Sequence, residues 1–222
     1  MNTRQSLLTL AALTGVIAIP FTAATSEATS VATATYEVTV TNLTAAQIMS
    51  PVLLVNHDDT VDVFEPGQAA STGLGQLAEE GDASLLMDSL TNDPGVGNLR
   101  LGTGALLPGA SETLTFDASG RFVSLASMLV TTNDAFAGID SFRLPTDSAT
   151  LNAVAYDAGT ERNSELCEYI PGPPCMSAGA HDPAPAEGHV FVHQGFRGVG
   201  SLGAHRYDWR NPVARVVIRR VH

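Results

Sequence analysis

An alternation of apolar and polar residues predicts short β-strands along most of the chain. In residues 36–42 a tyrosine and two valines alternate with polar residues, which is typical of a strand with one buried face. Residues 112–116 repeat this period of two, whereas residues 121–131 are rich in Phe, Val, Leu and Met and favour a central strand covered on both faces. Further strands are predicted at 49–55, 150–156, 189–193 and 213–221.

Residues 73–90 have a different pattern. Leu74 and Leu77 fall at helical spacing, and Leu86 and Leu90 lie four residues apart in a second stretch. These spacings predict one or two short helices. With about eight short strands separated by turn residues, the pattern predicts an all-β fold, an antiparallel eight-stranded β-sandwich.

The first residues have the pattern of an export signal. Arg4 supplies a short positive region, and residues 7–19 form an almost unbroken apolar run. This run is shorter than the roughly 20 residues that span a bilayer as a helix. We therefore expect a cleaved signal peptide and leader in residues 1–28. Residues 34–222 are then expected to form one domain, secreted or periplasmic, without membrane insertion of the mature chain.

The charge of the chain limits its partners. Acidic residues outnumber basic ones by 23 to 11, which gives a formal net charge of −12. Such a chain repels the phosphates of nucleic acid and anionic membrane surfaces, so we expect no nucleic acid partner. The same charge favours the binding of cations.

Two cysteines, Cys167 and Cys175, flank a short segment rich in Pro and Gly. An even number of cysteines in an exported protein favours a disulfide between them. Two ligands of a thiolate metal site would be the alternative, but the sequence offers no further Cys to complete such a site.

Acidic residues follow two of the predicted strands, and loops at strand ends gather at the same end of a sandwich. Asp134 lies in the segment 131–138, and Asp157 and Glu161 lie in the segment 156–161, where Gly159 allows the chain to fold back. Three converging carboxylates need a cation, and ligation by oxygen alone favours Ca²⁺. Alternatively, Asp134 and Asp157 are turn-forming acids that bond their own backbone.

Five segments in chain order resemble the N-terminal domain of the spondins, the F-spondin and mindin family, and suggest a prokaryotic secreted version of it. The most specific is Tyr156-Asp157-Ala158-Gly159-Thr160-Glu161, which is similar to the family's aspartate-alanine-glycine-threonine-aspartate motif. The resemblance covers residues 34 to 221. The other matching segments are residues 36–57, 73–83, 127–138 and 211–216.

The resemblance implies an eight-stranded antiparallel sandwich that carries one calcium ion. It places the metal ligands on Asp134, Asp157 and Glu161, of which Glu161 stands where the family has aspartate. The longer side chain keeps the charge but moves the carboxylate oxygens. Cys167 and Cys175 lie in a region that does not align with the family.

Histidines offer the candidate ligands of a second metal site. His189 and His193 lie four apart on one face of a predicted strand, and with His181 and His205 they would offer zinc ligands. In a straight strand, however, a spacing of four is too long for two ligands of one ion.

The sequence therefore predicts a secreted calcium-binding domain without catalytic residues, acting as an adhesion, binding or matrix protein. Its expected partner is a surface protein, a polysaccharide or a second copy of the chain. Two alternatives remain open: a calcium-dependent extracellular hydrolase, for which no Ser-His-Asp arrangement is visible, and a purely structural component of the cell envelope.

Overall fold

The computed structural model describes residues 33–221, so the predicted signal peptide and leader at 1–28 lie outside the described residues. The helices are α1 (Thr72–Glu80), α2 (Ser84–Thr91) and the single turn α3 (Ala204–Tyr207), with a 3-10 turn at Cys167–Tyr169. The strands are β1 (Thr35–Asn42), β2 (Leu53–His57), β3 (Val96–Leu101), β4 (Ser111–Asp117), β5 (Phe122–Met128), β6 (Ala135–Arg143), β7 (Ser148–Asp157), β8 (Phe191–Val192) and β9 (Ala214–Arg220).

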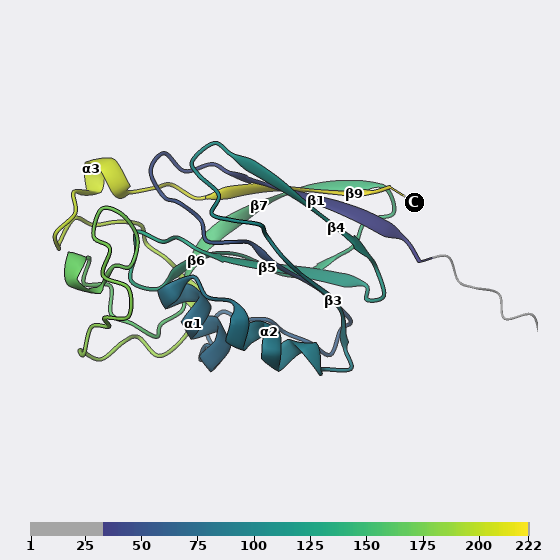
Figure 1. Ribbon diagram of the computed structural model, residues 1–222, viewed down its shortest axis with the longest axis horizontal. Coiled ribbons are helices and arrows are strands. Elements are labelled where there is room, and N and C mark those ends of the chain that lie inside the picture. Colours follow the sequence, from purple (N-terminus) through teal and green to yellow (C-terminus); the bar gives the residue numbers. More distant parts are fainter. Residues whose placement is uncertain (1–32, 222) are drawn as a thin grey trace, which may run out of the picture. The chain divides into compact units, whose positions relative to one another are not determined.

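All pairs of neighbouring strands are antiparallel, in the order β3-β2-β5-β6-β7-β9-β1-β4, and β8 pairs with β7 outside this path. The predicted all-β fold is therefore confirmed, with the two-residue β8 added to the eight strands of the continuous path. Figure 1 shows the strands in two layers, with α1 and α2 on the outer side of one of them.

Strand β7 connects the two layers. Its first part, Ser148–Ala153, pairs with β9, and its last part, Val154–Asp157, pairs with β6. The sandwich is thus one sheet that folds back on itself at β7. Because β7 ends at Asp157, the strand that joins the layers also delivers a predicted metal ligand to their edge.

Two hydrophobic clusters fill the spaces beside the layer of β2 and β5. Leu54 of this layer packs between the layers with Phe116 of β4 and Ile218 of β9. The neighbouring residues of β2 point the other way and pack against α1 and α2, as Leu53 does beside Leu74. The prediction that the 121–131 strand is covered on both faces is confirmed for β5.

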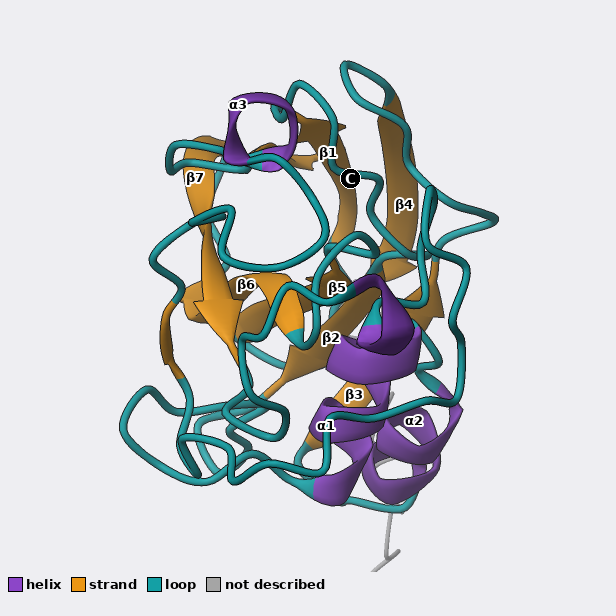
Figure 2. Ribbon diagram, turned by 90° about the vertical axis from the view of Figure 1, so that its left-hand side faces the viewer, coloured by secondary structure: helices purple, strands orange, loops and turns teal. Residues whose placement is uncertain are grey.

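The predicted helices are also confirmed, and local contacts explain their bounds. The Ser71 hydroxyl accepts a hydrogen bond from the Leu74 N–H at the start of α1, and Gly81 ends this helix in the left-handed conformation. Gly73 lies against the backbone of Leu86, where a Cβ would stand 2.6 Å from the Leu86 Cα. This close approach packs α1 against α2 (Figure 2).

The sequence patterns did not predict β3 and β6. β3 is an edge strand without a clear alternation, and β6 begins with Ala135, inside the segment 131–138 that was expected to be a loop. Ala135 and Ala137 are small and fully buried between the layers, so they give little hydrophobic signal. As a consequence, the acidic loop ends at Asp134.

The remaining connections agree with the expectations. Cys167 and Cys175 form a disulfide, with Cα atoms 4.9 Å apart. Residues 171–188 form a long segment without helix or strand. Within the described residues, no helix has the length and apolar character needed to cross a membrane.

Candidate metal site

The pairing of β6 with β7 brings Asp134 and Asp157 together. Asp157 stands opposite Ala135 in the register, and the Ala158 N–H donates a hydrogen bond to the Asp134 carbonyl at 3.1 Å. Both aspartate side chains are fully buried. Two acids from different strand ends therefore share one interior position.

The Asp134 carboxylate is only half satisfied. Its Oδ2 accepts hydrogen bonds from the backbone N–H groups of Thr160 at 2.9 Å and Glu161 at 3.0 Å. Its Oδ1 is buried and has no hydrogen-bond partner within the described part of the chain. A buried carboxylate oxygen without a partner is costly unless a proton or a cation meets it.

The loop after β7 is shaped to reach Asp134. The Asp157 Oδ1 accepts a hydrogen bond from the Gly159 N–H at 2.8 Å, and Gly159 adopts a positive φ of 68°. A Cβ at Gly159 would lie 2.2 Å from the His189 carbonyl oxygen. Glycine is therefore required here both for the turn and for the close approach of the segment that precedes β8.

The electrostatics of the pair disfavour two ionised carboxylates. Burial raises the pKa of Asp134 well above its ordinary value, and the charges of Asp157 and Glu187 raise it further. Burial also raises the pKa of Asp157, to about 6, against the lowering effect of hydrogen bonds from Asn163 and Gly159. A hard divalent ion bound directly to both carboxylates would offset the cost of their buried negative charges.

The side chain of Glu161 turns away from this pair, although its backbone N–H binds Asp134. Its Oε1 accepts hydrogen bonds from the Asp182 N–H at 2.7 Å and the Asn133 amide at 3.2 Å. Its Oε2 lies 3.6 Å from Nδ1 of His181. The carboxylates of Asp134 and Asp157 thus lie together, whereas Glu161 contacts this pair through its main chain.

Sequence patterns missed a chain of polar contacts behind Asp157. The Asn163 amide donates to Asp157 Oδ2, and the Asn163 Oδ1 accepts from His193 Nε2 at 2.9 Å. The Gly195 N–H donates to His193 Nδ1 at 3.0 Å, which fixes the neutral Nε2–H tautomer. Burial lowers the pKa of His193 to about 4. The alternating pattern predicted a strand over 189–193, but β8 covers only Phe191–Val192, so His193 lies just after it, and the pattern carried no signal of these contacts.

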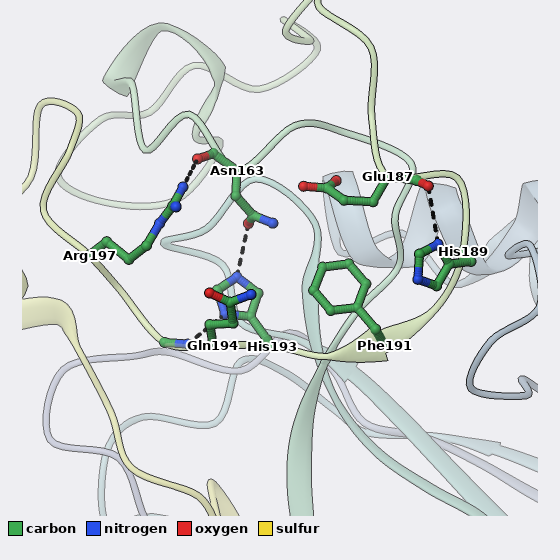
Figure 3. Close-up of a pocket in the computed structure, with 8 residues that line it drawn as sticks. Asn163, Glu187, His189, Phe191, His193, Gln194 and Arg197 are labelled. Carbon is green, nitrogen blue, oxygen red and sulfur yellow. Dashed lines mark hydrogen bonds between the residues drawn. The ribbon is translucent and has the colours of Figure 1, made fainter.

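A pocket of about 240 Å³ opens beside this chain of contacts. Figure 3 shows the side chains of Asn163 and His193 in contact on one side, and Phe191 and His189 on the other. The rings of His189 and Phe191 lie 5.5 Å apart. The full lining is Asn163, Glu187, His189, Phe191, His193, Gln194, Gly195 and Arg197.

One comparison with known proteins gives a match. The sequence model described as Spondin_N matches residues 35–168, a stretch that includes Asp134, Asp157 and Glu161. The long segment 171–188, β8, α3 and β9 lie beyond the matched residues, as does the resemblance noted at 211–216. A search of curated proteins finds no match.

Proposed function

This chain belongs to the spondin N-terminal domain family, and from that membership we propose that it is an extracellular binding protein organised by one calcium ion. The family supports a non-catalytic, adhesion-type role, and the Cys167–Cys175 disulfide agrees with an extracellular location. Asp134 and Asp157 are the proposed calcium ligands, whereas Glu161, the third ligand expected from the sequence, holds Asp134 through its backbone N–H while its carboxylate faces His181.

The unpartnered Oδ1 of Asp134 is the observation that carries this proposal. It is buried beside a second carboxylate, while Oδ2 of the same side chain is held by two backbone N–H groups. The donor set consists of oxygens, which suits Ca²⁺ better than zinc. Because calcium takes six to eight oxygens, backbone carbonyls and water must complete the shell.

The proposed role of the ion is to order the surface beside it. Asp157 holds Asn163, and Asn163 holds His193, so the pocket lining is fixed from the carboxylate outward. Phe191 and His189 offer aromatic faces in this pocket, and Arg197 and Glu187 offer charges. We propose that this surface binds an extracellular protein or polysaccharide.

The experiment is a thermal melt of chelator-treated protein with and without added calcium. At about one hundred times the dissociation constant, a bound ion adds about 2.7 kcal/mol, which corresponds to a rise in Tm of about 5–10 °C for a domain of this size. Asp157→Asn should abolish the rise, because it removes one of the two facing charges.

Two further variants complete the test. Asp88→Asn is the matched control, because Asp88 is exposed on α2 and should leave the calcium response unchanged. Glu161→Gln tests the third ligand expected from the sequence, and an unchanged calcium response is expected because its carboxylate faces His181. If calcium leaves the Tm of the wild-type protein unchanged, the metal proposal is refuted.

A further inference from the structure

Three potential metal ligands from distant segments meet next to the loops that carry Asp134 and Asp157. They are Glu79 at the end of α1, Glu161 after β7 and His181 in the long segment 171–188. One ligand atom from each lies within 4.8 Å of the other two. The His181 Nδ1 is 3.1 Å from Glu79 Oε2 and 3.6 Å from Glu161 Oε2.

A third carboxylate, that of Glu80, lies beside the imidazole. The His181 Nε2 lies 3.3 Å from Glu80 Oε1, which also accepts a hydrogen bond from the Gly179 N–H at 2.9 Å. This partner favours the proton on Nε2, as in the carboxylate–histidine pairs behind many metal ligands. With the proton on Nε2, the lone pair of Nδ1 would face the carboxylates of Glu79 and Glu161, and a cation between the three atoms would offset their repulsion.

We propose that Glu79, Glu161 and His181 form a second metal site, which binds a zinc-class divalent ion and is distinct from the calcium site. One imidazole nitrogen with two carboxylates is a donor set of zinc and its first-row neighbours, whereas calcium prefers oxygen alone. Glu80 acts as the positioning residue of His181.

The geometry permits this binding with small movements. Bonds of about 2.0–2.1 Å in a tetrahedral site separate the ligand atoms by about 3.4 Å. The two distances from His181 Nδ1, 3.1 and 3.6 Å, are already close to this value, so the main movement is a closer approach of the two carboxylates, which lie within 4.8 Å of each other. Glu161 is the fixed member, since its side chain is 3% exposed and its Oε1 is held by Asp182 and Asn133. His181 is 46% exposed, which leaves an entry path and room for a water ligand.

The consequence of binding would be to hold the long segment on α1. His181 lies beyond the residues that match the family, whereas Glu79 and Glu161 lie within them. The site therefore joins a matched part of the fold to a segment outside the match. The same segment carries Glu187, which lines the pocket beside Asp157, so the second ion would restrain one wall of that pocket.

Cobalt is the spectroscopic probe, because protein-bound Co²⁺ absorbs visible light. Zinc can then displace the bound Co²⁺ and remove this absorption. Chelator-treated full-length protein should bind one Co²⁺, and equimolar Zn²⁺ should remove the bands. His181→Ala should weaken Co²⁺ binding by about 100-fold or more, because loss of a ligand costs at least as much as the roughly 10–100-fold seen on mutation of an outer-shell partner. His205→Ala is the matched control, an exposed histidine on α3 whose removal should leave binding unchanged.

Further variants separate this site from the calcium site and from misfolding. Glu79→Gln keeps the shape of the side chain and should also weaken cobalt binding, with an unchanged metal-free Tm. Asp157→Asn should lose the calcium response and keep the cobalt bands. Absence of cobalt binding by the wild-type protein, equal binding by His181→Ala, or joint loss of both metals in a folded Asp157→Asn protein would overturn the proposal.

Discussion

Asp134 shows how a single residue can combine opposite roles. Its Oδ2 ties the loop after β7 to the start of β6 through two backbone hydrogen bonds, and its Oδ1 is left without a partner among the described residues. One oxygen therefore stabilises the loop, while the other destabilises the ion-free protein. This division agrees with the proposed calcium site, in which Oδ2 would hold the loop and Oδ1 would face the cation.

Replacing Asp134 with asparagine should separate the two roles. Asn keeps an oxygen for the Thr160 and Glu161 N–H groups but removes the charge that faces Asp157. In chelator, Asp134→Asn should raise the free energy of unfolding by about 1–3 kcal/mol, since wild type must bury a charge or take up a proton. In saturating calcium it should be the less stable protein.

Urea denaturation with and without calcium measures this crossing of stabilities. Asp88→Asn again serves as the control and should show the wild-type difference between the two conditions. If Asp134→Asn were less stable than wild type in chelator, the charge of Asp134 would not destabilise the ion-free protein, and the prediction would be wrong.

Prediction at the residue scale succeeded where the backbone fixes the position of a side chain, and it failed where contacts with other side chains fix its orientation. Asp134 and Asp157 were expected to converge because both follow strands, and the β6–β7 pairing confirms that they do. The orientation of the Glu161 carboxylate depends on Asp182 and His181, which approach from a segment without periodic pattern. No spacing rule connects such a segment to a strand end.

The elements show the same division. Helices and alternating strands were predicted because their periodicity reflects one buried face. β6 was missed because three of its four buried residues, Ala135, Ala137 and Gly138, are small, so Phe136 alone gives no hydrophobic stripe. Gly138 fills the tight space beside Phe64 and Tyr156. Small residues at a crowded interface are recognisable only when the neighbouring elements are in place.

Packing between α1 and α2 gives a test at this scale. Gly73→Ala should destabilise the domain by about 1–3 kcal/mol, because the new Cβ would lie 2.6 Å from the Leu86 Cα. This loss exceeds the gain of about 0.5–1 kcal/mol that alanine brings to a helix interior. The shift of α1 should also weaken cobalt binding, since α1 carries Glu79 and Glu80.

Gly104→Ala provides the comparison, because a Cβ at Gly104 meets no atom within 4 Å. Its stability by urea denaturation should stay close to that of wild type. Equal effects of the two substitutions would mean that the helix contact does not limit stability.

At the scale of the whole molecule, the fold extends past the residues that the family model matches. β9 lies beyond residue 168, yet it pairs with both β7 and β1 and joins the two halves of the sheet. Val213, just before β9, and Val216, within it, belong to the main hydrophobic cluster. The C-terminal part is therefore a central component of the sandwich.

A chain truncated after residue 168 should fail to fold. Without β9, β1 and β4 lose their connection to β7, and the cluster between the layers is opened to water. We expect the truncated chain to lack the cooperative thermal transition seen by circular dichroism in the full domain. A cooperative transition at a similar temperature would show that the matched residues form an independent unit.

The pairing of the first and last strands has a mechanical consequence. Tyr36 at the start of β1 pairs with Arg220 at the end of β9, so both ends of the described chain leave from one side of the sheet. Arg219 in turn pairs with Ser148, and nine residues further along β7 stands Asp157, about 30 Å away at 3.3 Å per residue. A tether at either terminus would hold the tip that carries Asp157 outward, whereas tension across both termini would separate β1 from β9 one residue pair at a time and leave that tip unloaded.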